Sequence, residues 1–222
     1  AEEQSGIQKT VLLCLMGVEG TLAIEDDENK LRKFPAFRFP ESAVNALGRV
    51  VKYVEYRKKP PGKLVWNKDV KAGEARMLIN NELEGLNSSQ AISTLNHTKA
   101  VNLLECFGIN YSDRGDGKAI NIKVRVKPDP LFGPLIEIEM SETKSILRIT
   151  PLTDADLNET LEEMNLNETS GIKEVLGRLS QMIEEIPWLW EFEALIIIGD
   201  KPLIMGDILL SIKSGGAERP TY

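Results

Sequence analysis

The sequence has one histidine, two cysteines and no long apolar run. His97 stands without a nucleophile motif near it, so a Ser/His/Asp or Cys/His catalytic site finds no support. Cys14 and Cys106 lack metal-ligand spacing and lie in apolar surroundings, so we expect two buried free thiols. A membrane-spanning helix needs about 18 or more consecutive apolar residues, and no such run occurs.

The sequence also has no excess of positive charge. Its formal net charge is −7, with 27 Lys and Arg against 34 Asp and Glu. Nucleic acids and anionic membranes both favour clustered cations, so neither is an expected partner. The one basic run, Arg57-Lys58-Lys59, fits the negative end of a helix dipole. The polar, acidic N-terminal residues show no signal-peptide pattern, and we expect a cytoplasmic protein.

What the sequence does contain is ordinary for a globular α/β chain. Apolar residues make up 42% and charged residues 27% of its 222 positions. Pro128 to Asp156 forms the centre of the pattern, with two alternating apolar segments bounded by turns rich in Pro and Gly. This stretch predicts strand, turn, strand and the start of a helix.

The N-terminal part predicts a small parallel sheet. The apolar run from Thr10 to Met16 is typical of a strand buried on both faces, and 36–39 predicts a second strand. Residues 18–33 between them predict a helix or a partly ordered connection. Pro40 then begins a helix that continues through Tyr56. Two strands rarely form a stable sheet, so further strands would come from later residues, a second copy or a different subunit.

The rest of the chain predicts an α+β layer. Short helices are expected from residue 73 and from Asn96 to Gly108, followed by a loop over 111–118. Residues 119–213 predict the order β-β-β-α-α-β-β, with a helix capped by Thr153 and a hairpin turn at 199–202. The tail over 214–222 is expected to be mobile.

Three stretches, in order, carry a family resemblance. They are Val11 to Gly17 with 37–47 and 53–57, then 95–109 (Leu-Asn-His-Thr-Lys-Ala-Val-Asn-Leu-Leu-Glu-Cys-Phe-Gly-Ile), and finally Asp-Pro-Leu-Phe-Gly-Pro at 129–134 with Arg-Ile-Thr-Pro-Leu-Thr-Asp-Ala-Asp at 148–156. Together they resemble the NDP-forming acyl-CoA synthetases, the ADP-forming acetate–CoA ligase relatives of succinyl-CoA synthetase.

The resemblance implies an α/β chain in two parts. The first is a partial flavodoxin-like parallel βαβα unit over 1–62, of the CoA-ligase type. Linker and helices over 63–118 resemble the start of an ATP-grasp module. An α+β, ATP-grasp-like C-terminal subdomain follows over 119–213, and the tail over 214–222 completes the sequence.

The sequence departs from the family at its functional positions. About ten residues separate Ile109 from the next strand, where the family carries a long nucleotide-binding lobe. Glu137-Ile-Glu-Met140 replaces the family's glycine-rich loop, and Leu195 stands where the family has a magnesium-site asparagine. His97 lies in a first helical turn and not in a phosphohistidine loop.

If ligand contacts of the family are retained, the resemblance assigns them to a few residues. The candidates for CoA, or for ADP or ATP with magnesium, are Gly17, Asp129, Phe132, Gly133 and Arg148, and the metal candidate is Asp207. Each also has a structural explanation. The two glycines would serve turns, Phe132 would be core, Arg148 would pair with an acid and Asp207 would face solvent.

Three functions remain open. The first is a non-catalytic subunit, derived from an acyl-CoA synthetase, with an assembly or regulatory role in a metabolic complex; such a chain would not be active alone. The second is one subunit of a split ADP-forming enzyme. The third is a binding module for a CoA thioester or a nucleotide. The first two require a protein partner or a homo-oligomer that completes the N-terminal sheet.

Overall fold

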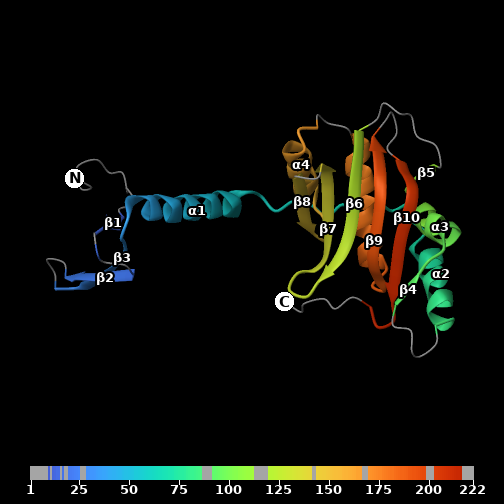
Figure 1. The fold of residues 1–222 in the computed structure, drawn as a ribbon, viewed down its shortest axis with the longest axis horizontal. Helices are drawn as coiled ribbons and strands as arrows, with labels where there is room; N and C mark the ends of the chain where they lie inside the picture. Colours follow the sequence, from blue (N-terminus) through green and yellow to red (C-terminus); the bar gives the residue numbers. More distant parts are fainter. Residues whose placement is uncertain are drawn as a thin grey trace. The chain divides into compact units, whose positions relative to one another are not determined.

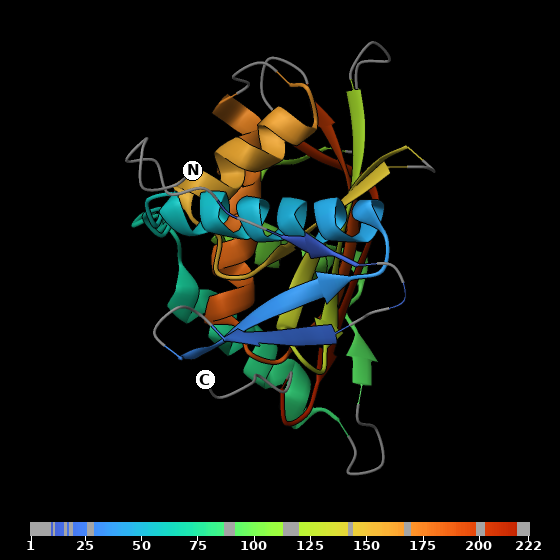
Figure 2. The ribbon, with the colours of Figure 1, turned by 90° about the vertical axis from the view of Figure 1, so that its left-hand side faces the viewer.

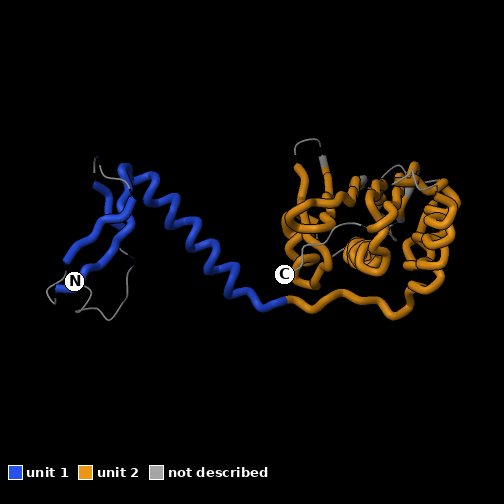
Figure 3. The backbone as a smooth tube through the Cα atoms, turned by 90° about the horizontal axis from the view of Figure 1, so that it is seen from below, with its two compact units in different colours: residues 1–61 blue, residues 62–222 orange. Residues whose placement is uncertain are grey.

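The computed structural model describes residues 10, 12–15, 17, 20–25, 29–86, 92–112, 120–141, 144–166, 170–198 and 203–216. The chain divides into two compact units, Ala1–Pro61 and Gly62–Tyr222, drawn in different colours in Figure 3. The predicted turn at 199–202, most of the predicted loop over 111–118 and all but three residues of the predicted tail lie outside the described residues.

Unit 1 contains a three-stranded sheet in the order β1-β3-β2, followed by one long helix (Figure 2). β1 is Leu13–Cys14, β2 is Gly20–Glu25 and β3 is Leu31–Phe37. β1 pairs with β3 in parallel, which confirms the parallel arrangement of these two segments. β2 pairs with β3 in an antiparallel register from Gly20↔Ala36 to Glu25↔Leu31.

Three sequence-based expectations for unit 1 are wrong. Residues 18–33 contain the strand β2 and the start of β3, not a helix. The first strand is short and half exposed, so the apolar run at Thr10–Met16 is not buried on both faces. Cys14 is accordingly exposed, although it is a free thiol as expected. The last two errors have one physical reason, because few described elements of unit 1 cover this sheet.

The helix α1, Pro40–Lys58, forms as predicted, with proline in its first turn and Arg57 and Lys58 in its last. Its apolar residues recur on one side at helical spacing. Only Ala43 is buried, whereas Val44 is 67% and Val50 is 57% exposed. The other exposed apolar and aromatic side chains of α1 are Val51, Tyr53, Val54 and Tyr56. The described part of unit 1 therefore leaves its helix almost uncovered.

Unit 2 is built on a seven-stranded sheet with helices on one of its faces (Figure 1). The strand order is β4-β10-β9-β6-β7-β8, and β5 pairs with β10 beside this path. The strands are β4 Ile92–Thr94, β5 Tyr111–Ser112, β6 Ile120–Asp129, β7 Gly133–Ser141, β8 Lys144–Ile149, β9 Leu189–Ile198 and β10 Leu203–Lys213. Neighbours on the main path are antiparallel.

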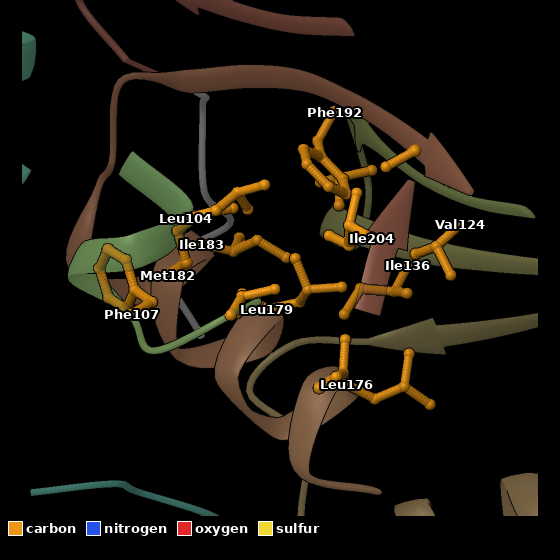
Figure 4. Close-up of a cluster of buried hydrophobic side chains, with 14 of the residues drawn as sticks. Leu104, Phe107, Val124, Ile136, Leu176, Leu179, Met182, Ile183, Phe192 and Ile204 are labelled. Carbon is orange, nitrogen blue, oxygen red and sulfur yellow. The ribbon is translucent and has the colours of Figure 1, made fainter. Parts of the chain in front are cut away.

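Alternation along the central strands explains which face is buried. In β6, Ile122, Val124 and Val126 point into the core, while Lys123 and Arg125 lie on the opposite face. Phe192 of β9 lies between Val126 of β6 and Leu210 of β10 in the sheet register. Figure 4 shows these strands contributing to one apolar cluster with Leu104, Phe107 and Leu176 from the helices.

Four helices cover this face. They are α2 Ala72–Glu84, α3 His97–Cys106, α4 Asp154–Glu163 and α5 Ser170–Glu185. The Asn96 side chain accepts a hydrogen bond from Lys99 N at the start of α3, and Thr153 and Asp156 form a capping box at the start of α4. Both caps confirm the predicted helix starts. Among the described helices, none combines the length and apolar character needed to span a lipid bilayer.

A buried arginine joins three parts of unit 2. Arg178 of α5 donates from Nη1 to the Phe107 carbonyl at 2.9 Å, from Nη2 to Asp69 Oδ2 at 2.7 Å and from Nε to Glu174 Oε1 at 3.0 Å. The hydrogen bond from this guanidinium is the main cause of the lowered pKa of Asp69. A side chain on Gly108 would meet Arg178, and the φ of Gly108 is +66°, so glycine is required there.

Candidate functional site

The predicted site residues that lie together are those of the β6–β7 hairpin. Asp129 pairs with Gly133 across the hairpin, and its Oδ1 accepts hydrogen bonds from Leu131 N at 2.8 Å and Phe132 N at 3.0 Å. Gly133 has a φ of +76°, which glycine adopts without strain. The Asp-Pro-Leu-Phe-Gly-Pro stretch is thus a closed, three-residue hairpin turn.

The expectation that Phe132 is a core residue is wrong. The turn holds it at the tip of the hairpin, where it is 49% exposed beside the exposed Leu131. Two large apolar side chains therefore project from the end of the sheet. Such an arrangement is more typical of a contact surface than of packing.

A shallow groove of about 220 Å³ lies beside this hairpin. It is lined by Pro128, Asp129, Pro130, Trp190 and Lys213. The Lys213 ammonium lies 4.0 Å from the centre of the Trp190 ring, a cation–π contact. Trp190 and Lys213 were not among the sequence candidates. A tryptophan on the open face of one strand and a lysine at the end of the next are the signal that could have indicated them.

The open face of the sheet carries a ladder of ion pairs next to the groove. Lys123 Nζ lies 2.6 Å from Glu193 Oε1, and Arg125 Nε lies 3.0 Å from Glu193 Oε2. Arg125 also contacts Glu137 Oε2 at 3.1 Å and Glu139 Oε2 at 2.7 Å. The hydrogen bond from Lys123, followed by that from Arg125, lowers the pKa of Glu193. The Glu193 carboxylate therefore stays ionised and paired at neutral pH.

The other three predicted residues lie elsewhere. Arg148 of β8 forms an ion pair with Glu163 of α4 at 2.9 Å, as its structural explanation predicted. Asp207 of β10 is exposed next to Gly206, whose φ is +77°. Gly17 belongs to unit 1 and has a φ of +90°. Within unit 2, the structure thus groups Asp129, Phe132 and Gly133 and separates Arg148 and Asp207 from them.

The reactive side chains His97 and Cys106 of unit 2 have a hydrogen-bond partner or are partly buried. His97 is exposed at the start of α3, and its Nε2 lies 2.8 Å from the Tyr111 hydroxyl. Burial is the first cause that raises the pKa of the Cys106 thiol, so this sulfur is protonated at neutral pH. Over the described residues, no group of three or more His, Cys, Asp or Glu side chains has a geometry that could hold a metal ion.

Comparison with known proteins gives a likeness in fold. No protein-family model matches the sequence, and no curated protein matches it. Among solved structures, the apo form of the dinucleotide-forming acetyl-coenzyme A synthetase 1 from Ca. Korarchaeum cryptofilum matches with a TM-score of 0.50 and 12% identity. The match covers 63% of this chain and 100% of that chain.

The same synthetase also matches as its selenomethionine derivative in complex with coenzyme A and Mg-AMPPCP, with its phosphohistidine segment pointing towards the nucleotide-binding site. That match has a TM-score of 0.37 and 15% identity and covers 89% of this chain and 86% of that chain. The first match shows that the mixed α/β fold of this chain is similar to that of an acetyl-CoA synthetase chain.

The ladder predicts a pH-dependent contribution to stability. The pKa of Glu193 is lowered from its ordinary value of 4.5, so its stabilising effect is complete above that pH and is lost as the pH falls through the folded pKa. We expect Glu193→Gln to lower the free energy of unfolding at pH 7 by up to about 1 kcal/mol. The difference from the wild type should shrink below pH 4.5 in urea titrations.

The neighbouring carboxylate on the same face, Glu191→Gln, is the matched control for this prediction. It removes one charge from the same strand without touching Lys123 or Arg125. A Glu193→Gln effect that is constant over pH, or equal to that of the control, would contradict the role given to the ladder.

Proposed function

We propose that this chain is a non-catalytic subunit of a cytoplasmic acyl-CoA-synthetase-like complex, in which a partner protein covers unit 1. The observation that carries the proposal is the uncovered helix α1. A helix whose apolar side spans nearly half of its circumference is typical of a helix packed on a sheet or another helix. In unit 1 this side exposes Val44, Val50, Val51 and Val54, while Leu47 is half-buried.

The short sheet of unit 1 supports the same conclusion. β1 contributes two residues to its pairing with β3, and among the described residues β1 has no other neighbour. A three-stranded sheet of this kind, with Ala36 as its buried apolar residue, buries little area by itself. Strands and a helix from a partner would complete both the open edge and the uncovered helix.

The fold likeness to an acetyl-CoA synthetase chain suggests which kind of complex this is. The sequence departures suggest the role. The two glutamates in 137–140 lie in the ion-pair ladder of the open face, and Leu195 replaces an expected magnesium ligand. An assembly or regulatory subunit is compatible with both substitutions, whereas a split catalytic subunit would have to obtain these functions from its partner.

A binding module is the second candidate, and the groove beside Asp129 favours it. A single cation over an indole, next to the hairpin with the family-like sequence, is a reasonable site for one anionic group. CoA, acyl-CoA and ADP with magnesium are the ligands to test, because the matched synthetase was solved with coenzyme A and Mg-AMPPCP.

The test begins with the native complex, purified from its source without a tag and weighed intact with each chain identified. We expect a hetero-complex with stoichiometric partner chains. The double variant Val50→Glu/Val54→Glu, on the apolar side of α1, should lose them. Asn45→Glu/Lys52→Glu on the polar side is the matched control and should keep them.

Activity then separates the alternatives. ATP- and CoA-dependent activity that requires this chain's own Asp207 would favour the split enzyme. A lone monomer that binds CoA or ADP in calorimetry, with affinity lost in Lys213→Ala, would favour the binding module. Either result would overturn the proposed non-catalytic role in assembly.

A further inference from the structure

The strand β8 forms one end of the unit 2 sheet. Among the described residues it pairs with β7 alone, in a register from Leu135↔Ile149 to Ser141↔Lys144. Its backbone groups on the other side form an open edge. Such edges template pairing with another strand unless they are blocked.

This edge presents large apolar side chains to solvent. Leu147 is 57% and Ile149 is 50% exposed, both on the face of the sheet opposite to the helices. Their neighbour Ile146 points to the other face and is buried. An edge strand with two exposed branched apolar residues is an association surface.

The hydrogen-bond pattern shows which backbone groups are available. Thr150 N donates to Pro134 O at 3.5 Å, so even-numbered residues direct their backbone groups towards β7. Residues 145, 147 and 149 therefore direct theirs outward. In agreement, the outward carbonyl of Leu147 accepts a hydrogen bond from Arg148 Nη1 at 3.1 Å rather than from β7.

We propose that β8 pairs with β8 of a second copy of this chain, antiparallel and around a two-fold axis. The sequence of β8 suits one register. With Leu147 opposite Leu147 of the second copy, Ser145 lies opposite Ile149, Ile146 opposite Arg148 and Lys144 opposite Thr150. The outward groups of 145, 147 and 149 then bond reciprocally, and the four exposed Leu and Ile side chains meet on one face.

The neighbouring registers are disfavoured by charge. A shift of two residues one way sets Arg148 opposite Arg148, and a shift the other way sets Lys144 opposite Arg148. Like charges directly opposite in a sheet are destabilising. A two-fold dimer requires that the same patch on both copies pairs with itself, and β8 can do so in one register. An unrelated partner strand would not explain this self-complementarity.

The dimer leaves the helix side of β8 intact. Arg148 keeps its ion pair with Glu163 Oε1 at 2.9 Å, and Lys144 keeps its contact with the Glu163 carbonyl. Only the bond from Arg148 to the Leu147 carbonyl is exchanged for a backbone bond. The surface belongs to unit 2, whereas the proposed partner of the preceding subsection covers unit 1, so the two proposals fail separately.

The mass of the full chain over a wide concentration range, by light scattering and sedimentation, tests this pairing. We expect a dimer that dissociates on dilution and a dissociation constant raised at least about tenfold by Leu147→Lys. Leu131→Lys is the matched control, since Leu131 is exposed at 71% on the hairpin tip and should leave the dimer unchanged. Circular dichroism confirms that both variants are folded.

A cross-link tests the register. In a chain with Cys14→Ser and Cys106→Ser, Leu147→Cys should form a disulfide-linked dimer on oxidation, because directly opposite bonded residues lie within disulfide range. Leu131→Cys should not form a disulfide-linked dimer under the same conditions. A wild-type chain that stays monomeric, a dimer unaffected by Leu147→Lys but lost in Val50→Glu/Val54→Glu, or a different protein bound at this edge would overturn the proposal.

Discussion

Phe192→Ala should lower the free energy of unfolding of unit 2 by about 3–5 kcal/mol. Phe192 is 1% exposed and belongs to the apolar cluster in Figure 4. In the sheet register it lies between Val126 and Leu210. Its removal leaves a cavity that strands on both sides keep open, because the hydrogen-bonded ladder prevents them from closing it. Among the described residues, one cluster contains nearly all buried side chains of unit 2, so no second core compensates for the loss.

The measurement is urea unfolding followed by tryptophan fluorescence. All three tryptophans belong to Gly62–Tyr222, so the signal reports on unit 2 alone. Phe132→Ala is the matched control, the same change at a side chain that is half exposed, and it should cost less than about 1 kcal/mol. Equal losses at the two positions would contradict the assignment of one residue to the core and the other to the hairpin tip.

Arg178→Ala should produce the second large effect, a loss of about 2–3 kcal/mol in the same assay. Arg178 is 7% exposed, and its removal leaves the Phe107 carbonyl without its hydrogen-bond donor. This carbonyl lies at the end of α3, where Gly108 leaves room for the guanidinium. Its two acid partners are largely exposed and regain solvation, which limits the loss.

Arg76→Ala is the control for that experiment. Arg76 also binds α5, through the carbonyl and carboxylate of Glu185, but its side chain is 50% exposed. Exposed ion pairs contribute at most about 1 kcal/mol. A loss at Arg76 as large as that at Arg178 would show that charge, and not the buried hydrogen bond to Phe107, is the source of the stabilisation.

The sequence predicted the elements of unit 2 well because its local signals agree with its tertiary contacts. The alternation at Ile122, Val124 and Val126 corresponds to one buried face, and the caps at Asn96 and Thr153 start the helices where their side chains bond the backbone. In unit 1, proline in the first turn of α1 likewise marks where that helix begins. Each of these signals acts within a few residues.

The errors arose where burial depends on distant parts of the chain. Residues 20–25 form a strand although they lead into an acidic run, and the left-handed Asn29 that precedes the next strand, with a φ of +55°, was the available signal. Cys14 and Phe132 were assigned to a core by their apolar neighbours, yet the fold places little against them.

The candidate site could be predicted only in part for the same reason. Asp129, Phe132 and Gly133 are adjacent in sequence, so one hairpin keeps them together. Trp190 and Lys213 reach the same groove through the order of the strands, so their residue types can be read from each strand but not their place beside Asp129. Whether that groove holds a ligand stays a prediction.

The place of β10 in the sheet has a consequence for synthesis. β10 lies between β4 (92–94) and β9 (189–198) in the sheet, although it follows both of them in the sequence. β4 and β9 are therefore joined only after β10 has been synthesised. Until Leu203–Lys213 emerges from the ribosome, β9 lacks its neighbouring strand on one side and α3 lacks the strand on which it packs. The apolar residues that β10 would cover are exposed during this time. The core of unit 2 is therefore completed late in translation, when β10 pairs with β4 and β9.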